Sequence, residues 1–391
     1  MSISEAVAEA GRASYARIVA TLIRITGDWS LAEDCAQEAL AAALEKWPHD
    51  GVPGNPGGWL MTVARNRAVD LVRRTAVEAR KLRELAAMPV FSDDTPDIED
   101  DRLRLIFTCC HPALSLEARV ALTLRTIAGV PTADIARAFL VTEPTMTRRI
   151  TRAKTKIAEA RIPYRVPSGA ALVERVPGVL GVLYLLFTRG YDADGEPAFA
   201  DEAIRLARLL VALMPDEPEA SGLLALCLLQ HSRRRARRSA SGALVTLEKQ
   251  DRARWDRAMI DEGLAIVART PVTGPYAVQA RIAAAHAADS TDWAAVAHWY
   301  DVLLAAQPTP AVALNRAVAH GYAFGPAAGL ALLPGISGLP DCYVLAVEAD
   351  LTARAGDRSR ATGLFRRAAE SAPSEPEREA LLTRAAELST G

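Results

Sequence analysis

The chain has 391 residues, of which half are hydrophobic and only 5% aromatic, and its formal net charge is -1. This length predicts two or three domains, and the near-neutral charge excludes a chain that is basic throughout, so any nucleic-acid surface is local. A composition rich in Ala, Leu and Arg predicts an all-α fold. Five scattered cysteines, the absence of a signal peptide and a longest apolar run of only 176–187 indicate a cytoplasmic protein with no membrane partner.

Residues 31–47 predict an amphipathic helix. Its broad apolar side comprises Leu31, Cys35, Ala39, Leu40, Leu44 and Trp47. Its narrow polar face comprises Asp34, Gln37, Glu38, Ala41 and Glu45. Because phosphate repels acidic side chains, this face indicates a protein partner with basic groups. The alternative is an ordinary solvated helix face.

A second helix is predicted over 59–74, after a turn rich in Pro and Gly. The side opposite its apolar stripe carries Trp59, Thr62, Val63, Asn66, Asp70 and Arg73. An aromatic ring stacks on an unpaired base, an amide reads a base edge, and an arginine binds phosphate. This face therefore predicts a site for unstacked bases, with Trp59 as a simple core anchor as the alternative.

Charge is organised along the chain in blocks. Residues 53–83 are predominantly basic, 84–101 carry acids only, and 142–165 are basic again. This pattern predicts a first domain at 1–83, an acidic linker at 84–101 and a second domain at 102–162. The linker is either a solvated spacer or a segment that follows a basic channel of a partner.

Residues 132–157 predict a helix-turn-helix. Thr142 is placed as the N-cap of the second helix, and Pro144 lies in its first turn. The apolar stripe of this helix comprises Met146, Ile150, Ala153 and Ile157. Its opposite side carries Thr145, Arg148, Arg149, Arg152 and Lys156. Turn, cap and stripe agree, which favours a recognition helix in the major groove of DNA over a solvated basic face.

Two segments, DWSLAEDCAQEAL from residue 28 and GGWLMTVARNRAVDLVRR from residue 57, resemble region two of the extracytoplasmic-function RNA polymerase sigma factors. The helix-turn-helix resembles region four of the same family. The resemblance implies that Asp34, Gln37 and Glu38 contact the β′ clamp helices of core polymerase, and that region four docks on the β flap. It implies a minus-ten DNA site at Trp59, Thr62, Asn66, Asp70 and Arg73. It implies a minus-thirty-five site at Thr145, Arg148, Arg149, Arg152 and Lys156.

The remainder, 163–391, is predicted to be a TPR-like helical extension. Four segments resemble a sigma-factor subgroup with such an extension: FTCCHPAL, RIPYRVP, LYLLFTRGY and LEKQDRARWDRAMIDEGL. Helices are predicted at 200–214, 218–231, 292–306, 311–321, 343–355, 359–371 and 376–388. LYLLFTRGY is expected to pack as a core, and the subgroup suggests a small protein partner.

Other motifs are weaker. Cys109, Cys110 and His111 have no second ligand pair, and Asp192, Asp194 and Glu196 lack the remainder of a calcium loop, so neither a metal nor a cofactor is predicted. The arginine run 233–238 is interpreted as a solvated loop, with contact to DNA or polymerase as the alternative.

No catalytic constellation is present, so we expect a transcription initiation factor and not an enzyme. The rival interpretation is a ligand- or peptide-sensing DNA-binding regulator that never binds core polymerase.

Overall fold

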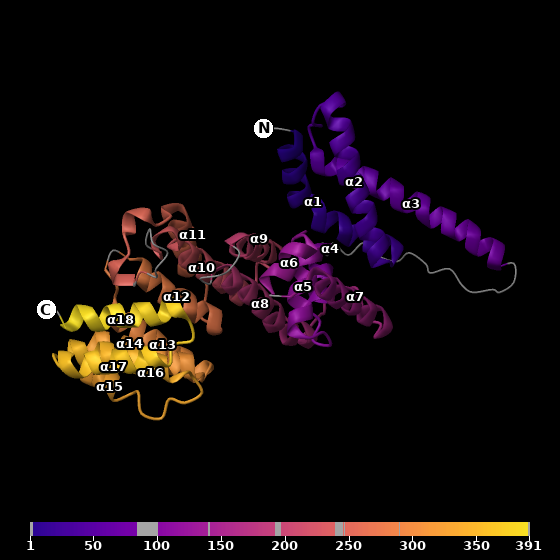
Figure 1. Cartoon of the computed structure of the whole chain (residues 1–391). Helices are drawn as coiled ribbons and strands as arrows, with labels where there is room; N and C mark the ends of the chain where they lie inside the picture. The colour runs from indigo at the N-terminus through magenta and orange to yellow at the C-terminus, as the bar shows by residue number, and fades with distance from the viewer. Residues whose placement is uncertain are drawn as a thin grey trace. The chain divides into compact units, whose positions relative to one another are not determined.

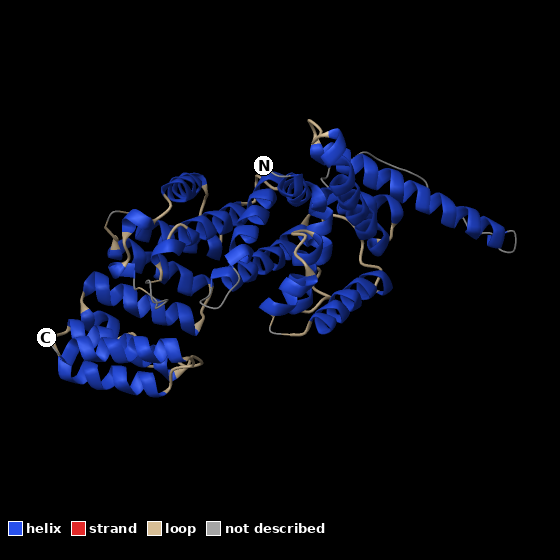
Figure 2. Ribbon diagram, turned by 45° about the horizontal axis from the view of Figure 1, so that its top comes forward, coloured by secondary structure: helices blue, strands red, loops and turns tan. Residues whose placement is uncertain are grey.

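The computed structural model describes residues 3–83, 101–139, 141–191, 197–238, 245, 247–288 and 290–389. These residues form helices and contain no β-strand (Figure 2), which confirms the predicted all-α fold. The chain divides into two compact units, Met1–Leu206 and Ala207–Gly391 (Figure 1). The predicted acidic linker, apart from Asp101, and the acidic residues at 192, 194 and 196 lie outside the described residues.

The first unit begins with three helices that pack on one another: α1 (Ile3–Thr26), α2 (Trp29–Asp50) and α3 (Pro56–Arg83). Helix α2 begins where the Asp28 carboxylate accepts a hydrogen bond from the Leu31 amide, at 3.1 Å. It ends at Gly51, whose φ of 80° favours glycine. Small side chains form much of the contact between the helices, including Ala36, Ala39, Ala64 and Ala68.

The predicted helix-turn-helix is confirmed. Helices α4 (Asp101–Cys109) and α5 (Leu116–Thr126) precede α6 (Thr132–Ala138) and α7 (Glu143–Glu159), and α7 packs on both α5 and α6. Thr142 is the N-cap residue of α7, but its hydroxyl hydrogen-bonds to the Thr145 hydroxyl at 2.9 Å and caps no backbone amide. The buried residues of α7 are those of the predicted stripe: Met146, Ile150, Ala153 and Ile157.

Helix α8 (Ala170–Tyr191) packs on α4 and α5, and α9 (Pro197–Leu213) follows it. LYLLFTRGY lies in α8, where Leu183 and Phe187 are buried. The apolar run 176–187 lies within this helix, and 170–190 is long and apolar enough to cross a membrane by length and composition. Core helices of soluble proteins meet the same criteria, so length and composition do not establish a span.

The second unit is an array of helices in which successive members pack together, as in helical-repeat proteins (Figure 1). The predicted helices are confirmed within a few residues, whereas α11, α12 and the short α15 were not predicted. Three 3₁₀ turns lie between α10 and α11, and the arginine run is in that connection as expected. The helices are α10 (Pro218–His231), α11 (Arg257–Arg269), α12 (Pro275–Ala287), α13 (Trp293–Ala306), α14 (Pro310–Phe324), α15 (Pro326–Leu330), α16 (Asp341–Arg354), α17 (Arg358–Glu370) and α18 (Glu375–Ser389).

One half-buried histidine, His286, makes the stability of this array depend on pH. His286 packs its ring edge against Trp293, with ring centroids 5.3 Å apart. Burial, with the positive charges of Arg233 and Arg252, lowers the pKa of His286 from 6.5 to about 4. The unfolded chain therefore takes up this proton first as the pH falls, and the folded state loses stability between about pH 6.5 and 4.

We expect this histidine to contribute on the order of 3 kcal/mol to the loss of unfolding free energy across that window. Urea unfolding of wild type and His286→Gln, followed by circular dichroism at pH 7 and pH 4, measures the contribution as the difference between the two pH dependences. The exposed His298→Gln is the matched control. Equal pH dependence in wild type and His286→Gln would contradict the expectation.

Candidate nucleic-acid interface

Helix α7 presents a basic face opposite its buried stripe. Thr145, Arg148, Arg152 and Lys156 are exposed, and Arg149 is half-buried. The Arg149 guanidinium lies 5.8 Å from the centroid of the Phe139 ring, which holds it over the end of α6. A face of guanidinium, ammonium and hydroxyl groups on the second helix of a helix-turn-helix can donate hydrogen bonds to base edges and phosphates.

Helix α3 brings the residues of the expected minus-ten site to one side. Thr62, Asn66, Asp70 and Arg73 are exposed at helical spacing. Trp59, at the start of the helix, is half-buried and packs edge-on against buried Trp47, with centroids 5.5 Å apart. The anchor interpretation of Trp59 thus has direct support, and the rest of the face remains accessible to an unpaired strand.

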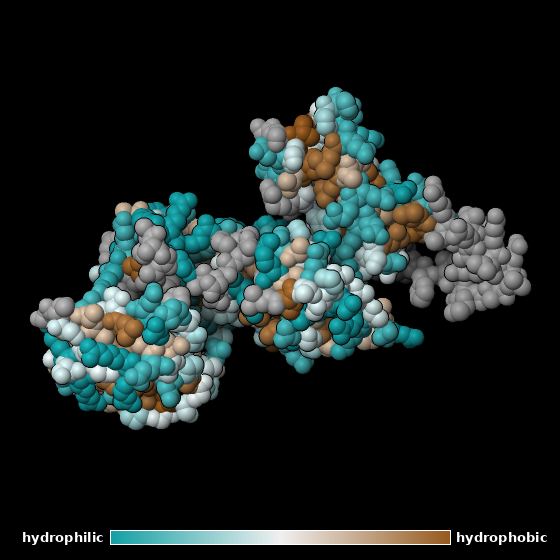
Figure 3. Space-filling view, in the orientation of Figure 1, coloured by the Kyte–Doolittle hydropathy of each residue, from teal (hydrophilic) through white to brown (hydrophobic). Residues whose placement is uncertain are grey.

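Helix α2 exposes the acidic and amide face, including Asp34, Gln37 and Glu38. Glu38 forms an ion pair with Arg67 of α3, in which Arg67 Nη2 lies 3.3 Å from Glu38 Oε1. The expectation that Leu44 belongs to the apolar side is wrong, because it is 49% exposed. It continues this face one turn beyond Ala41. Apolar patches lie among hydrophilic residues over the first three helices (Figure 3).

A largely buried ion pair joins α2 to α7, and sequence reasoning missed it. Lys154 Nζ lies 2.7 Å from Oε2 of Glu33, and the Thr126 hydroxyl donates to Glu33 Oε1 at 3.3 Å. Glu33 is only 7% exposed. A signal existed in the sequence: Glu33 stands between Ala32 and Ala36 on the buried side of the predicted helix, where a carboxylate requires a partner.

Tyr164 makes a second connection between the α1–α3 module and the helix-turn-helix module. Its hydroxyl lies 3.0 Å from the carbonyl oxygen of Ala20 in α1 and 3.2 Å from that of Asp101 in α4. Burial, with the nearby Asp101 carboxylate, raises the pKa of this hydroxyl, so it stays a hydrogen-bond donor. Farther along the chain, the Arg175 guanidinium of α8 donates to the Phe107 carbonyl of α4.

We expect Lys154→Met to destabilise the docking of α7 against α2, because it leaves the Glu33 carboxylate buried and unpaired. Breaking one side of a buried pair typically costs about 3–5 kcal/mol. The double variant Glu33→Gln/Lys154→Met should recover most of the loss. Exposed Lys156→Met, on the same helix, is the control. Urea unfolding and amide exchange in α2 and α7 measure the effect, and a Lys154→Met protein as stable as the control would contradict it.

The cysteine-histidine motif ends α4. Cys109 and Cys110 are buried, and the Cys110 sulfur lies 3.7 Å from the Thr123 hydroxyl. Burial raises the pKa of Cys110 to about 11, so its thiol stays protonated at neutral pH. Nδ1 of His111 accepts a hydrogen bond from the Ala113 amide at 3.2 Å. The described residues hold no cluster of three His, Cys, Asp or Glu side chains arranged for a metal ion.

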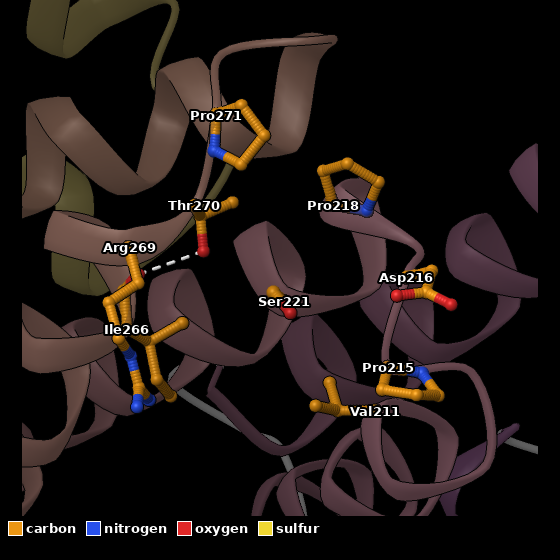
Figure 4. A pocket seen from close by; sticks show the side chains of 9 residues that line it. All are labelled: Val211, Pro215, Asp216, Pro218, Ser221, Ile266, Arg269, Thr270 and Pro271. Carbon is orange, nitrogen blue, oxygen red and sulfur yellow. Dashed lines mark hydrogen bonds between the residues drawn. The ribbon is translucent and has the colours of Figure 1, made fainter.

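The second unit contains a pocket of about 370 Å³ where the ends of α9 and α11 meet the start of α10 (Figure 4). Its lining is mainly apolar, with one carboxylate and one guanidinium. The residues are Val211, Pro215, Asp216, Pro218, Ser221, Ile266, Arg269, Thr270 and Pro271.

Three segments of the chain match models of protein families. Residues 12–77 match Sigma-70 region 2, and 104–157 match Sigma-70 region 4. Residues 175–271 match a family of unknown function, DUF6596. The first two matches cover α2 and α3 with their exposed faces, and α7 with its basic face. The fold and these faces define a Sigma-70-type transcription initiation factor.

Relatives refine the class. ECF RNA polymerase sigma factor SigL of Mycobacterium tuberculosis is 34% identical over 156 residues, which are 37% of this chain and 86% of SigL. The chain therefore belongs to the extracytoplasmic-function (ECF) RNA polymerase sigma factors and carries a C-terminal helical extension. An uncharacterised protein of Rhizobium meliloti is 44% identical over 338 residues, which are 80% of this chain and 78% of that protein.

More distant similarities add no further argument. Probable ECF sigma factor SigI of M. tuberculosis is 30% identical over 169 residues, 41% of this chain and 58% of SigI. Among solved structures, yeast Tom70 matches with a TM-score of 0.37 and 11% identity, covering 99% of this chain and 85% of Tom70, a likeness too low to interpret.

Proposed function

We propose that this chain binds core RNA polymerase in the cytoplasm, directs it to particular promoters and has no catalytic activity of its own. One observation carries the proposal: a single compact unit exposes an acidic and apolar face on α2 and a basic face on α7. The two faces have opposite chemistry and suit two partners, a protein with basic groups and DNA. A simple DNA-binding regulator has no use for the α2 face.

The sites are assigned as follows. Asp34, Gln37 and Glu38 contact the β′ clamp helices, and region four docks on the β flap. Thr62, Asn66, Asp70 and Arg73, with Trp59 at their edge, hold the melted minus-ten element. Thr145, Arg148, Arg149, Arg152 and Lys156 read the minus-thirty-five element. The exposure of all but Trp59 and Arg149, which are half-buried, supports these roles.

The extension modulates this activity. Its first residues contact the sigma modules through Tyr164 and Arg175, and the Glu33–Lys154 pair closes the modules on each other. Polymerase binding to a more open form would shift the population away from this closed form, so contacts that hold the closed form oppose it. The helical array also suits a small protein partner.

Transcription in vitro with core polymerase tests the proposal. Core enzyme plus the full chain should give discrete transcripts from a subset of a fragment library of the source genome, and core enzyme alone should not. The rival regulator would bind particular fragments by itself, would not co-purify with core enzyme and would give no new transcript. That pattern would overturn the proposal.

A further inference from the structure

Two basic segments meet in the second unit, in the connection between α10 and α11. Residues 232–238 carry the 3₁₀ turn η1 (Arg234–Ala236), and residues 247–257 carry η2 (Leu247–Lys249) and η3 (Arg252–Arg254). Turns η1 and η3 pack together, and the Asp256 amide donates to the Ser232 carbonyl at 2.9 Å. Together the two segments hold nine Lys or Arg residues against three carboxylates, whereas the whole chain has a net charge of -1.

Buried Trp255 organises this basic surface. The guanidinium of Arg252 lies 4.6 Å from the Trp255 ring centroid, and that of Arg233 lies 5.9 Å away. One ring therefore brings together arginines that lie nearly 20 residues apart in sequence. The surface defined by Arg233, Arg235, Arg252, Arg254 and Arg257 is called the η1–η3 patch below.

Each of the three carboxylates of these segments already has a partner in the fold. Asp251 accepts from the Ala253 amide at 3.0 Å, and Asp256 caps α11 by accepting from the Met259 amide at 3.1 Å. Glu248 forms an ion pair with Arg354 at 2.9 Å.

The outer arginines of the patch remain accessible. Arg235, Arg254 and Arg257 are exposed, and across the described ranges of the chain no ion pair to them is found. The lowered pKa of neighbouring His286, caused in part by Arg233 and Arg252, agrees with a positive local potential.

We propose that the η1–η3 patch binds the phosphate backbone of duplex DNA, as a sequence-independent contact additional to the recognition helix. Exposed guanidiniums without an ion-pair partner among the described residues form a phosphate-binding surface. The one large apolar side chain at its centre, Trp255, is only 5% exposed, so the patch lacks the accessible aromatic or apolar anchor that a protein interface needs. The proposal extends the proposed function, because such a contact would increase DNA affinity without adding promoter specificity.

The salt dependence of DNA binding tests whether the η1–η3 patch contacts phosphates. The full chain is titrated onto a fluorescent 40-base-pair duplex of arbitrary sequence, from about 50 to 200 mM NaCl, as wild type and as Arg235→Gln/Arg254→Gln/Arg257→Gln. If all three arginines contact phosphates, the slope of log K against log salt should fall by about 2.7. The matched control is Arg358→Gln/Arg366→Gln/Arg367→Gln, which removes three exposed charges from α17 in the same unit.

If the salt slope of the patch variant equals that of wild type, the proposal is overturned. It is also overturned if the slope of the α17 control variant falls as much as that of the patch variant. An unchanged DNA slope, together with weakened binding to immobilised core polymerase in a separate pull-down, would overturn the proposal and assign the patch to an acidic protein surface. Because the duplex carries no promoter and the assay contains no polymerase, its result is independent of transcription. If the wild-type chain fails to initiate transcription but the patch variant shows the expected change in salt slope, the proposed function is wrong and the proposal for the patch stands.

Discussion

Replacing Asp34 with lysine is expected to abolish co-purification of the chain with core RNA polymerase. Asp34 is exposed at the start of the acidic α2 face, so the substitution disturbs no core packing. In the bound state it would bring a cation against the basic groups of the polymerase. Losing one partner of a close interfacial charge pair typically costs about 2–5 kcal/mol, and like-charge juxtaposition costs a similar amount. The affinity should therefore fall by at least about 30-fold.

The contacts of Asp34 and Glu38 show which substitution tests polymerase binding without also disturbing the fold. Glu38 pairs with Arg67, so Glu38→Lys would place two cations together between α2 and α3 and would mix a folding defect with a binding defect. Asp34→Lys alone avoids this, and Glu9→Lys on α1, also exposed, is the matched control. Pull-down on immobilised core enzyme and circular dichroism are measured on both. A folded Asp34→Lys protein with wild-type affinity would remove α2 from the polymerase interface.

Periodicity predicted the helix-turn-helix well because its recognition helix buries one narrow stripe. The four apolar positions of α7 recur at helical spacing and are the buried ones. Leu44 shows the limit of this reasoning. The covered arc of α2 is lined by small side chains such as Ala36 and Ala43, so the apolar stripe in the sequence is wider than the buried surface. Hydrophobic periodicity alone therefore assigns the exposed Leu44 to the core.

Contacts between distant segments could not be predicted in the same way. Glu33 and Lys154 are 121 residues apart, and nothing in their spacing pairs them. Even where a carboxylate is expected on a buried side, the sequence does not show which cation pairs with it. A proline usually interrupts a helix, yet Pro177 lies inside α8. The loss of one backbone hydrogen bond is offset there by burial of neighbours such as Val176 and Val179.

Replacing Arg152 with alanine is expected to reduce transcription from the chain's own promoters about 5- to 150-fold. Arg152 is exposed on the basic face of α7, and a lost bidentate contact to a base costs about 1–3 kcal/mol. Arg149 is a less direct probe, because its guanidinium also lies over the Phe139 ring and helps to fix α6 against α7. Arg149→Ala should therefore lower both thermal stability and transcription, whereas Arg152→Ala should leave thermal stability unchanged.

Competition between a promoter duplex and a scrambled duplex shows which kind of contact Arg152 makes. If it reads a base, Arg152→Ala should weaken binding to the promoter duplex far more than to a scrambled duplex, with little change in salt slope. If it binds phosphate, both duplexes should weaken alike and the slope should flatten by about 0.9. Lys156→Ala, one turn farther along the same face, provides the comparison. Unchanged transcription in Arg152→Ala, Arg149→Ala and Lys156→Ala together would mean that this face of α7 does not read the minus-thirty-five element.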